Sequence, residues 1–382
     1  GKLNPEAAHA LSGSTLVALG KPDGGARPIA IGEVIARVVG RASCVQLRAP
    51  LNDYFEPNQF GVMAKGGAEQ IVHTITAHLA RNPGHALVSL DARNAFNSIN
   101  RGAMLKALLA APPAIRALYP MVSQFYLHDG ELAMYDEESK LVTKLLSKSG
   151  ARQGDPLGPL LFALAIHPIL VRVQAKMRNR GVHVLAYLDD IYVLGPPDAA
   201  AEATRALRKE LLKLNLYLNE DKCEAWSPSG QYGELVVADE NGFKLVPKPG
   251  GIKILGLYVG ESAAERNLRA LKDTSKSKSL ANKLACLVEF AKAGFQSHAL
   301  SLLLMCAAPS PNYVIRASRP ADAQETAKAA DEMLTSAFGV ITGIEAEREL
   351  APGTRARAQL SAPQEKGGIG LLSLVVRAKT AY

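Results

Sequence analysis

The sequence predicts a mixed fold of the α/β (α+β) class, and three observations point to it. Strand-like apolar runs alternate with helical stretches of varied length, and no internal repeat relates them. The chain has 382 residues, 48% of them hydrophobic and 21% charged, which is enough to build a substantial core. After Ser262 the strand signals stop. We therefore expect a mixed N-terminal part, a domain boundary at Ser262 and a mainly helical remainder.

The elements of the first half each follow from a local pattern. Two apolar runs flank turn-forming residues 21–25, which predicts a hairpin over 16–31. A short buried-strand pattern over 86–91 ends on Asp91. Apolar residues at helical spacing predict helices over 32–48, 67–80, 158–174 and 199–214.

The second half begins with another strand that ends on acids. Residues 182–190 form a strand pattern ending on Asp189 and Asp190, and a return strand over 191–195 follows at once. Further expected elements are a hairpin over 235–246 around an Asn241-Gly242 turn, a strand over 252–259, and a capping box at Ser262 and Glu265.

Charge and cysteine content restrict the partners and the compartment. The formal net charge is +8 and the pI about 9.2, which fits a polyanionic partner. Residues 262–320 carry nine Lys or Arg against three Asp or Glu, so the basicity is concentrated there. The four cysteines form no C-x-x-C pair, which argues against a zinc site and for a reducing compartment.

No membrane partner is expected. The longest apolar stretch, residues 158–171, is shorter than the roughly 20 residues that a membrane helix needs. The first residues carry neither an initiator Met nor a signal pattern, so we expect a piece of a longer protein.

The strongest chemical signal is the set of three aspartates at strand ends. Neighbouring strands could hold Asp91 beside Asp189 and Asp190, and clustered carboxylates persist only when a cation neutralises them. Mg²⁺ prefers such oxygen ligands, and two ions about 3.5–4 Å apart suit phosphoryl transfer. The alternative is that Asp189 and Asp190 form a solvated turn.

The residues around these acids occur in a familiar order. Three segments resemble core motifs of reverse transcriptases, and their sequences are most similar to those of non-LTR retrotransposons. They are residues 91–99 (DARNAFNSI), 150–162 (GARQGDPLGPLLF) and 187–190 (YLDD). The resemblance extends over residues 16–260. Its outer motifs are residues 21–25 with 27–29, residues 59–61 with 66–69, residues 218–222, and a primer grip at Ile254, Leu255 and Gly256.

The resemblance implies a right-hand polymerase with fingers, a palm on a split β-α-β sheet, and a helical thumb. The implied domains are fingers over 1–86, palm over 87–261 with a fingers-side insertion around 101–149, thumb over 262–345, and a C-terminal extension over 346–382.

The resemblance also implies roles for single residues. Asp91 and Asp189 would be the principal metal ligands, with the Ala92 carbonyl completing a site and Asp190 in support. The implied cofactor is a pair of Mg²⁺ ions, which Mn²⁺ could replace. The implied nucleotide contacts are Lys21 and Arg27 on the triphosphate, Gln153 against the nucleotide, and Lys222 as proton donor to pyrophosphate. The alternatives are that Lys21 is only a turn lysine, that Arg27 is a surface residue, and that Gln153 caps a helix.

Phe96 and Leu188 need separate interpretation. A rigid ring near the sugar position would clash with a 2′-hydroxyl, so Phe96 predicts dNTP use, the alternative being core packing. Leu188 departs from the Ala or Met that is common in the family, so packing around the primer terminus is expected to differ.

The basic segment predicts a phosphate-binding stripe. If residues 263–284 form one helix, five cations fall within a roughly 120° arc at about 100° per residue. They are Arg266, Arg269, Lys272, Lys276 and Lys283. Such a stripe would follow the backbone of a template–primer duplex. The alternative is a solvated face, and residues 274–279 contain enough Ser and Thr to break the helix.

The implied activity is RNA-templated synthesis of DNA from dNTPs on a DNA or RNA primer, by a protein with further polyprotein domains. The alternatives are an RNA-directed RNA polymerase and a non-catalytic nucleic-acid-binding module. The implied localisation is nuclear for a eukaryotic retrotransposon and cytoplasmic otherwise.

Overall fold

The computed structural model describes residues 4–20 and 24–379, and these fold into two compact units. Among the described residues, the first unit comprises 4–20, 24–71 and 78–249, and the second comprises 72–77 and 250–379. The division at residues 249 and 250 falls earlier than the predicted boundary at Ser262. The fingers, palm and thumb ranges stay predictions.

The first unit contains two sheets. The larger has the order β6-β7-β3-β8-β9 and is antiparallel except for the β8–β9 pair. Its strands are β3 (Ala86–Leu90), β6 (His183–Tyr187), β7 (Asp190–Gly195), β8 (Glu224–Trp226) and β9 (Val246–Pro247).

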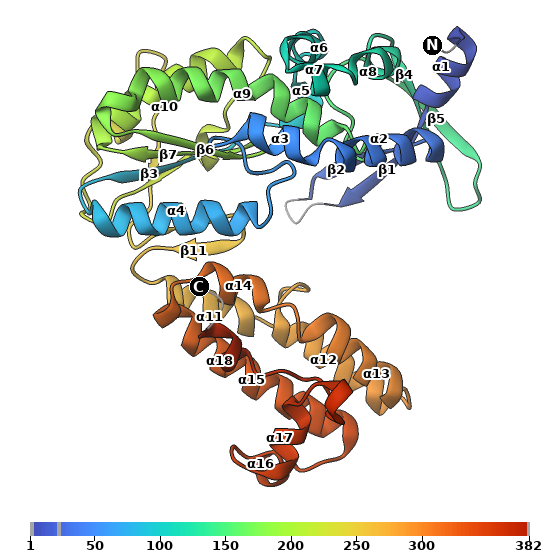
Figure 1. The fold of residues 1–382 in the computed structure, drawn as a ribbon, viewed down its shortest axis with the longest axis vertical. Helices are drawn as coiled ribbons and strands as arrows, with labels where there is room; N and C mark the ends of the chain where they lie inside the picture. The colour runs from blue at the N-terminus through green and yellow to red at the C-terminus, as the bar shows by residue number, and fades with distance from the viewer. Residues whose placement is uncertain (1–3, 21–23, 380–382) are drawn as a thin grey trace. The chain divides into compact units, whose positions relative to one another are not determined.

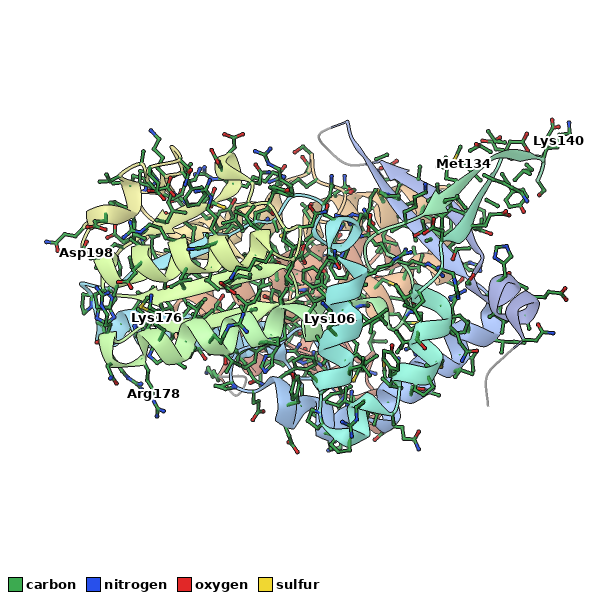
Figure 2. The ribbon with its side chains drawn as sticks, turned by 90° about the horizontal axis from the view of Figure 1, so that it is seen from above. Lys106, Met134, Lys140, Lys176, Arg178 and Asp198 are labelled. Atoms are coloured by element: carbon green, nitrogen blue, oxygen red, sulfur yellow. The ribbon has the colours of Figure 1, made fainter. Side chains whose placement is uncertain are left out.

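The smaller sheet joins segments from both sides of β3. Its order is β2-β1-β4-β5, with β1 antiparallel to β2 and parallel to β4. Figure 2 shows Met134 on β4 and Lys140 at the far end of the β4–β5 hairpin. The strands are β1 (Ser14–Gly20), β2 (Ala26–Gly32), β4 (Gly130–Tyr135) and β5 (Leu141–Ser147).

Two long helices cover one face of the larger sheet (Figure 1). Helix α9 (Gly158–Met177) is apolar nearly all round and is buried along most of its length, as its composition predicted. Helix α10 (Pro197–Leu212) buries its alanine-rich face against α9, β3 and β7. Together they enclose the core of this unit.

The other helices of the first unit are mostly short. The α-helices are α1 (Pro5–Ser12), α2 (Val34–Gln46), α3 (Arg48–Phe55), α4 (Gly67–Arg81), α5 (Ala95–Ser98), α6 (Arg101–Ala110), α7 (Pro113–Arg116) and α8 (Tyr119–Tyr126). Residues 72–77, in the middle of α4, are grouped with the second unit. The 3₁₀ helices are η1 (Arg178–Arg180), η2 (Glu220–Lys222) and η3 (Gly233–Val236).

One segment is long and apolar enough to cross a membrane by length and composition. It is Gly158–Arg180, which spans α9 and η1, and 67% of its most apolar window is buried inside the protein. The core helix of a globular protein passes the same test.

The second unit is helical after one short hairpin, formed by β10 (Ile252–Ile254) and β11 (Leu257–Val259). Its helices are α11 (Ala263–Lys272), α12 (Leu280–Lys292), α13 (Gln296–Leu302), η4 (Leu303–Ala307), α14 (Asn312–Ala317), α15 (Pro320–Thr342), α16 (Ala346–Glu349), α17 (Arg355–Ser361), η5 (Gln364–Lys366) and α18 (Leu374–Ala378). Helix α15 runs through its core.

Two predicted strand elements are wrong in form. The single strand expected over 252–259 is the β10–β11 hairpin, because Leu255 and Gly256 take positive φ (45° and 89°) and reverse the chain. The hairpin expected over 235–246 is absent. Its Asn241-Gly242 turn exists, but the Asp239 carboxylate closes it by accepting backbone N–H groups, and no flanking strands pair.

The continuous helix expected over 263–284 is also wrong. Asp273 accepts hydrogen bonds from the backbone N–H and the hydroxyl of Ser275, which ends α11, and Ser279 caps a new helix, α12. The predicted capping box is not formed. The Ser262 hydroxyl donates to the Gly250 carbonyl, and Glu265 pairs with Arg269.

Candidate active site

The larger sheet places two of the predicted acids together. Strands β3 and β7 are antiparallel, and Leu90 pairs with Ile191. Asp91 directly follows β3, and Asp189 lies in the two-residue turn between β6 and β7. Both line one cavity of about 530 Å³. Asp190, the first residue of β7, is not among the lining residues.

The same cavity gathers side chains from five separated segments of the chain. Besides the two acids, its lining includes the predicted residues Arg27, Ala92, Phe96, Gln153 and Lys222. The prediction assigned no role to the other lining residues, which are Pro28, Arg93, Asn94, Ala95, Asn97 and Asn219. All six lie next to or within the motifs described above, and this position in the sequence could have indicated that they belong to the site.

Burial and neighbouring charges shift the pKa of two of the aspartates. Burial raises the pKa of the Asp189 carboxyl, and the neighbouring Asp91 raises it further, while Arg27 opposes the shift. Burial, followed by the charges of Asp189 and Asp91, raises the pKa of Asp190 to about 6. A cation at this place would therefore stabilise the ionised carboxylates.

Backbone hydrogen bonds join the segments that carry the lining residues. The N–H of Ala30 on β2 donates to the Gln153 carbonyl at 2.6 Å, which fixes the strand of Arg27 beside the 150–157 loop. On the opposite side, the N–H of Asn219 donates to the Asp91 carbonyl at 2.8 Å. This second bond leads the chain directly into η2, which carries Lys222.

Phe96 packs against the core and also faces the cavity, and its role in selecting dNTPs stays a prediction. Its ring stacks on Phe162 of α9, with 4.7 Å between ring centroids and 17° between planes, and it also lines the cavity. The N–H of Ala151 donates to the Phe96 carbonyl at 2.7 Å, so the loop before α9 fixes helix α5. Phe96 is thus a half-buried wall of the cavity.

Other predicted residues lie outside this cavity or outside the described part of the chain. Lys21 is among residues that the structure does not describe. Ile254 ends β10, and Leu255 and Gly256 form the turn of the β10–β11 hairpin in the second unit. The hydroxyl of Tyr313 donates to the Leu255 carbonyl at 2.8 Å.

The cations of the predicted basic stripe do not lie on one continuous helix, and their contact with a template–primer duplex stays a prediction. Its five cations are divided between α11 (Arg266, Arg269 and Lys272), the loop that follows it (Lys276) and α12 (Lys283). The Arg266 guanidinium donates to the Gly251 carbonyl, Arg269 pairs with Glu265, and Lys276 pairs with Asp273.

The donor set of the cavity fits a hard divalent cation better than a soft one. Its anionic groups are the carboxylates of Asp91 and Asp189, and neither His nor Cys is among the described lining residues. Across residues 4–20 and 24–379, no three His, Cys, Asp or Glu side chains form a compact metal-binding group. Backbone oxygen and bound phosphate would have to complete the coordination.

Comparisons with known proteins agree with this geometry. The profile of a family described as reverse transcriptase (RNA-dependent DNA polymerase) matches residues 19–259. The chain is 32% identical over 228 residues to the retrotransposable element SLACS 132 kDa protein of Trypanosoma brucei gambiense, covering 60% of this chain and 19% of that protein. It is 24% identical over 214 residues to the Pol polyprotein of element R2DM from Drosophila melanogaster, covering 54% and 20%. The chain therefore matches about a fifth of the length of these relatives.

Solved structures show the same fold. Apo telomerase from Candida tropicalis aligns with a TM-score of 0.53 at 12% identity, covering 98% of this chain and 64% of that one. The same enzyme in complex with a fragment of telomeric RNA aligns with a TM-score of 0.50 at 11% identity, covering 98% and 65%. With the family match, this likeness confirms the predicted α+β right-hand polymerase fold.

Proposed function

The chain belongs to the reverse transcriptase (RNA-dependent DNA polymerase) family, and from this premise we propose that it performs RNA-templated DNA synthesis as part of a longer retrotransposon protein. One observation carries the proposal. Two acids, three cations, four amides and an aromatic ring from five separated segments line a single cavity.

The lining residues suit the parts of a deoxynucleoside triphosphate. Arg27 and Lys222 supply positive charge for the triphosphate, and Lys222 would also give a proton to the leaving pyrophosphate. Phe96 would close the space beside C2′ of the sugar, and Gln153 would contact the nucleotide. Catalysis would then depend on positioning and charge rather than on a covalent intermediate.

Members of this family use divalent metal ions. We propose that Asp91 and Asp189, with the Ala92 carbonyl, hold two Mg²⁺ ions and that Asp190 supports the site, with Mn²⁺ as a substitute. When bound, such ions would stabilise the attacking and leaving oxygens of the phosphoryl transfer.

The proposed partners are an RNA template and a DNA or RNA primer, together with the other domains of the polyprotein. We expect no membrane partner. Localisation would follow the element, nuclear in a eukaryotic host and cytoplasmic otherwise.

Primer extension on poly(rA)/oligo(dT) with Mg²⁺ tests the proposal. We expect incorporation of dTTP and not UTP, loss of synthesis in Asp189→Asn, and nearly unchanged duplex affinity in that variant, since Lys and Arg contacts to phosphate dominate binding. Asp53→Asn, an exchange of an exposed aspartate on α3, is the matched control and should remain active. Incorporation of UTP would favour an RNA polymerase, and duplex binding without synthesis would favour a non-catalytic module.

A further inference from the structure

The turn that carries Asp189 has an unusual backbone. Tyr187 pairs with Asp190, so the β6–β7 hairpin closes with a two-residue loop made of Leu188 and Asp189. Of these two residues only Leu188 has positive φ, at 58°. A hairpin loop with positive φ at its first position normally takes glycine there, because a side chain is disfavoured in this region. Such a conformation persists only when surrounding contacts impose it.

The buried side chain of Gln59 supplies those contacts. Its amide oxygen accepts the N–H of Leu188 at 2.8 Å, and its amide nitrogen donates to the Leu188 carbonyl at 3.4 Å. Gln59 is 2% exposed, and the same oxygen also accepts the N–H of Gly61 at 3.0 Å. Both backbone polar groups of Leu188 are therefore bound by one side chain.

The chain around Gln59 is shaped to bring it to the turn. The Asn58 carbonyl accepts the N–H of Ala186, and the N–H of Phe60 donates to the Ala186 carbonyl, at 2.7 and 2.8 Å. These bonds align the segment with strand β6. A Cβ atom at Gly61 would lie 2.6 Å from both the N and the Cγ of Leu188, so only glycine permits this approach.

We propose that Gln59 is a positioning residue that fixes the Leu188 backbone and thereby the orientation of the Asp189 carboxylate. The inference rests on the proposed function, because it concerns the carboxylate assigned there to the metal ions. Gln59 lies outside the cavity lining and acts through the turn.

The experiment compares Gln59→Leu with Asn58→Leu. The control removes a neighbouring buried amide, 3% exposed, which donates to Val184 at the other end of β6. Mn²⁺ affinity is measured from the electron paramagnetic resonance signal of free Mn²⁺, and kcat and KM are measured by primer extension. Hydrogen exchange of the segment 185–190 reports the Leu188 amide.

We expect Gln59→Leu to weaken Mn²⁺ binding and to lower kcat, each by about tenfold, with an unchanged KM for template–primer. Exchange at the turn should accelerate in this variant. Asn58→Leu should lose a similar amount of thermal stability while keeping wild-type Mn²⁺ affinity and kcat. If Gln59→Leu does not fold, Gln59→Asn, which keeps a buried amide but is too short to reach the turn, should show the same losses.

Two results have distinct meanings. An active wild type in which the Gln59 variants behave as Asn58→Leu does would overturn this inference alone. A wild type that makes no DNA and binds Mn²⁺ no better than Asp189→Asn would overturn the proposed function itself.

Discussion

A buried histidine in the core helix should make the first unit sensitive to acid. His167 of α9 is 4% exposed, and its ring lies 4.9 Å from that of Tyr54 and 5.3 Å from that of Phe55, between centroids. Within the described residues its Nδ1 atom has no hydrogen-bond partner. Burial lowers the pKa of His167 from 6.5 to about 4, and a backbone hydrogen bond with Tyr54 opposes part of that shift.

The size of the effect follows from proton linkage. The folded state keeps the ring neutral, whereas the unfolded chain takes up a proton near pH 6.5, so the unfolded state binds more protons below that pH. Above pH 6.5 the protonation of His167 therefore costs no stability, and the free energy of unfolding falls as the pH falls from about 6.5 to about 4. At 1.36 kcal/mol per pKa unit, the loss is about 2 kcal/mol at pH 5 and about 3 kcal/mol below pH 4.

Urea unfolding at pH 7 and pH 5, followed by the fluorescence of the single tryptophan, measures this loss. Trp226 lies in β8 and is buried, so it reports the first unit. His167→Phe keeps an aromatic ring and should lose about 2 kcal/mol less than wild type between the two pH values. His128→Phe, at an exposed position of the same unit, should retain the loss caused by His167. An equal pH dependence in wild type and His167→Phe would refute the reasoning.

Three further changes have expected outcomes. Phe96→Val should raise rNTP incorporation relative to dNTP by about 5- to 150-fold in a competition assay, since it relieves a clash of about 1–3 kcal/mol; an unchanged ratio would assign the ring to packing alone. Tyr126→Phe removes the 2.6 Å hydrogen bond from its hydroxyl to Asp155 and should lower the free energy of unfolding by about 1–3 kcal/mol in urea. Asp331→Asn replaces the carboxylate that accepts three hydrogen bonds at the start of α18. It should lower the free energy of unfolding by about 1–2 kcal/mol, seen as a lower midpoint of thermal unfolding by circular dichroism.

The sequence predicted elements whose patterns are local and strong. Helix α9 and the strands that precede Asp91 and Asp189 were confirmed, because continuous apolar runs of helix or strand length leave few alternatives. The prediction of a single strand over 252–259 was wrong because Leu255 adopts a positive φ, which a leucine rarely does. The helix over 263–284 was wrong because the side chain of Asp273 captures backbone groups that a helix would use.

In the candidate site too, residues within local motifs were predicted, whereas contacts between residues distant in the sequence were not. Seven of its lining residues were predicted because each lies in a recognisable motif. The contact of Gln59 with Leu188 joins residues 129 positions apart, and no spacing rule connects them. Only the fold reveals which motif supports which.

The parallel pairing of β1 with β4 limits which segments of this chain can be removed or altered. Strand β4 pairs with β1, so excising residues 101–149 would leave β1 with an unpaired edge. It would also remove Arg101, whose guanidinium donates to the carbonyls of Ser147 and Gly150. The tip of that hairpin is the opposite case, since residues 135–142 are exposed around Lys140 (Figure 2). A peptide tag or fluorophore placed there would give a handle for immobilisation or single-molecule work without entering the cavity.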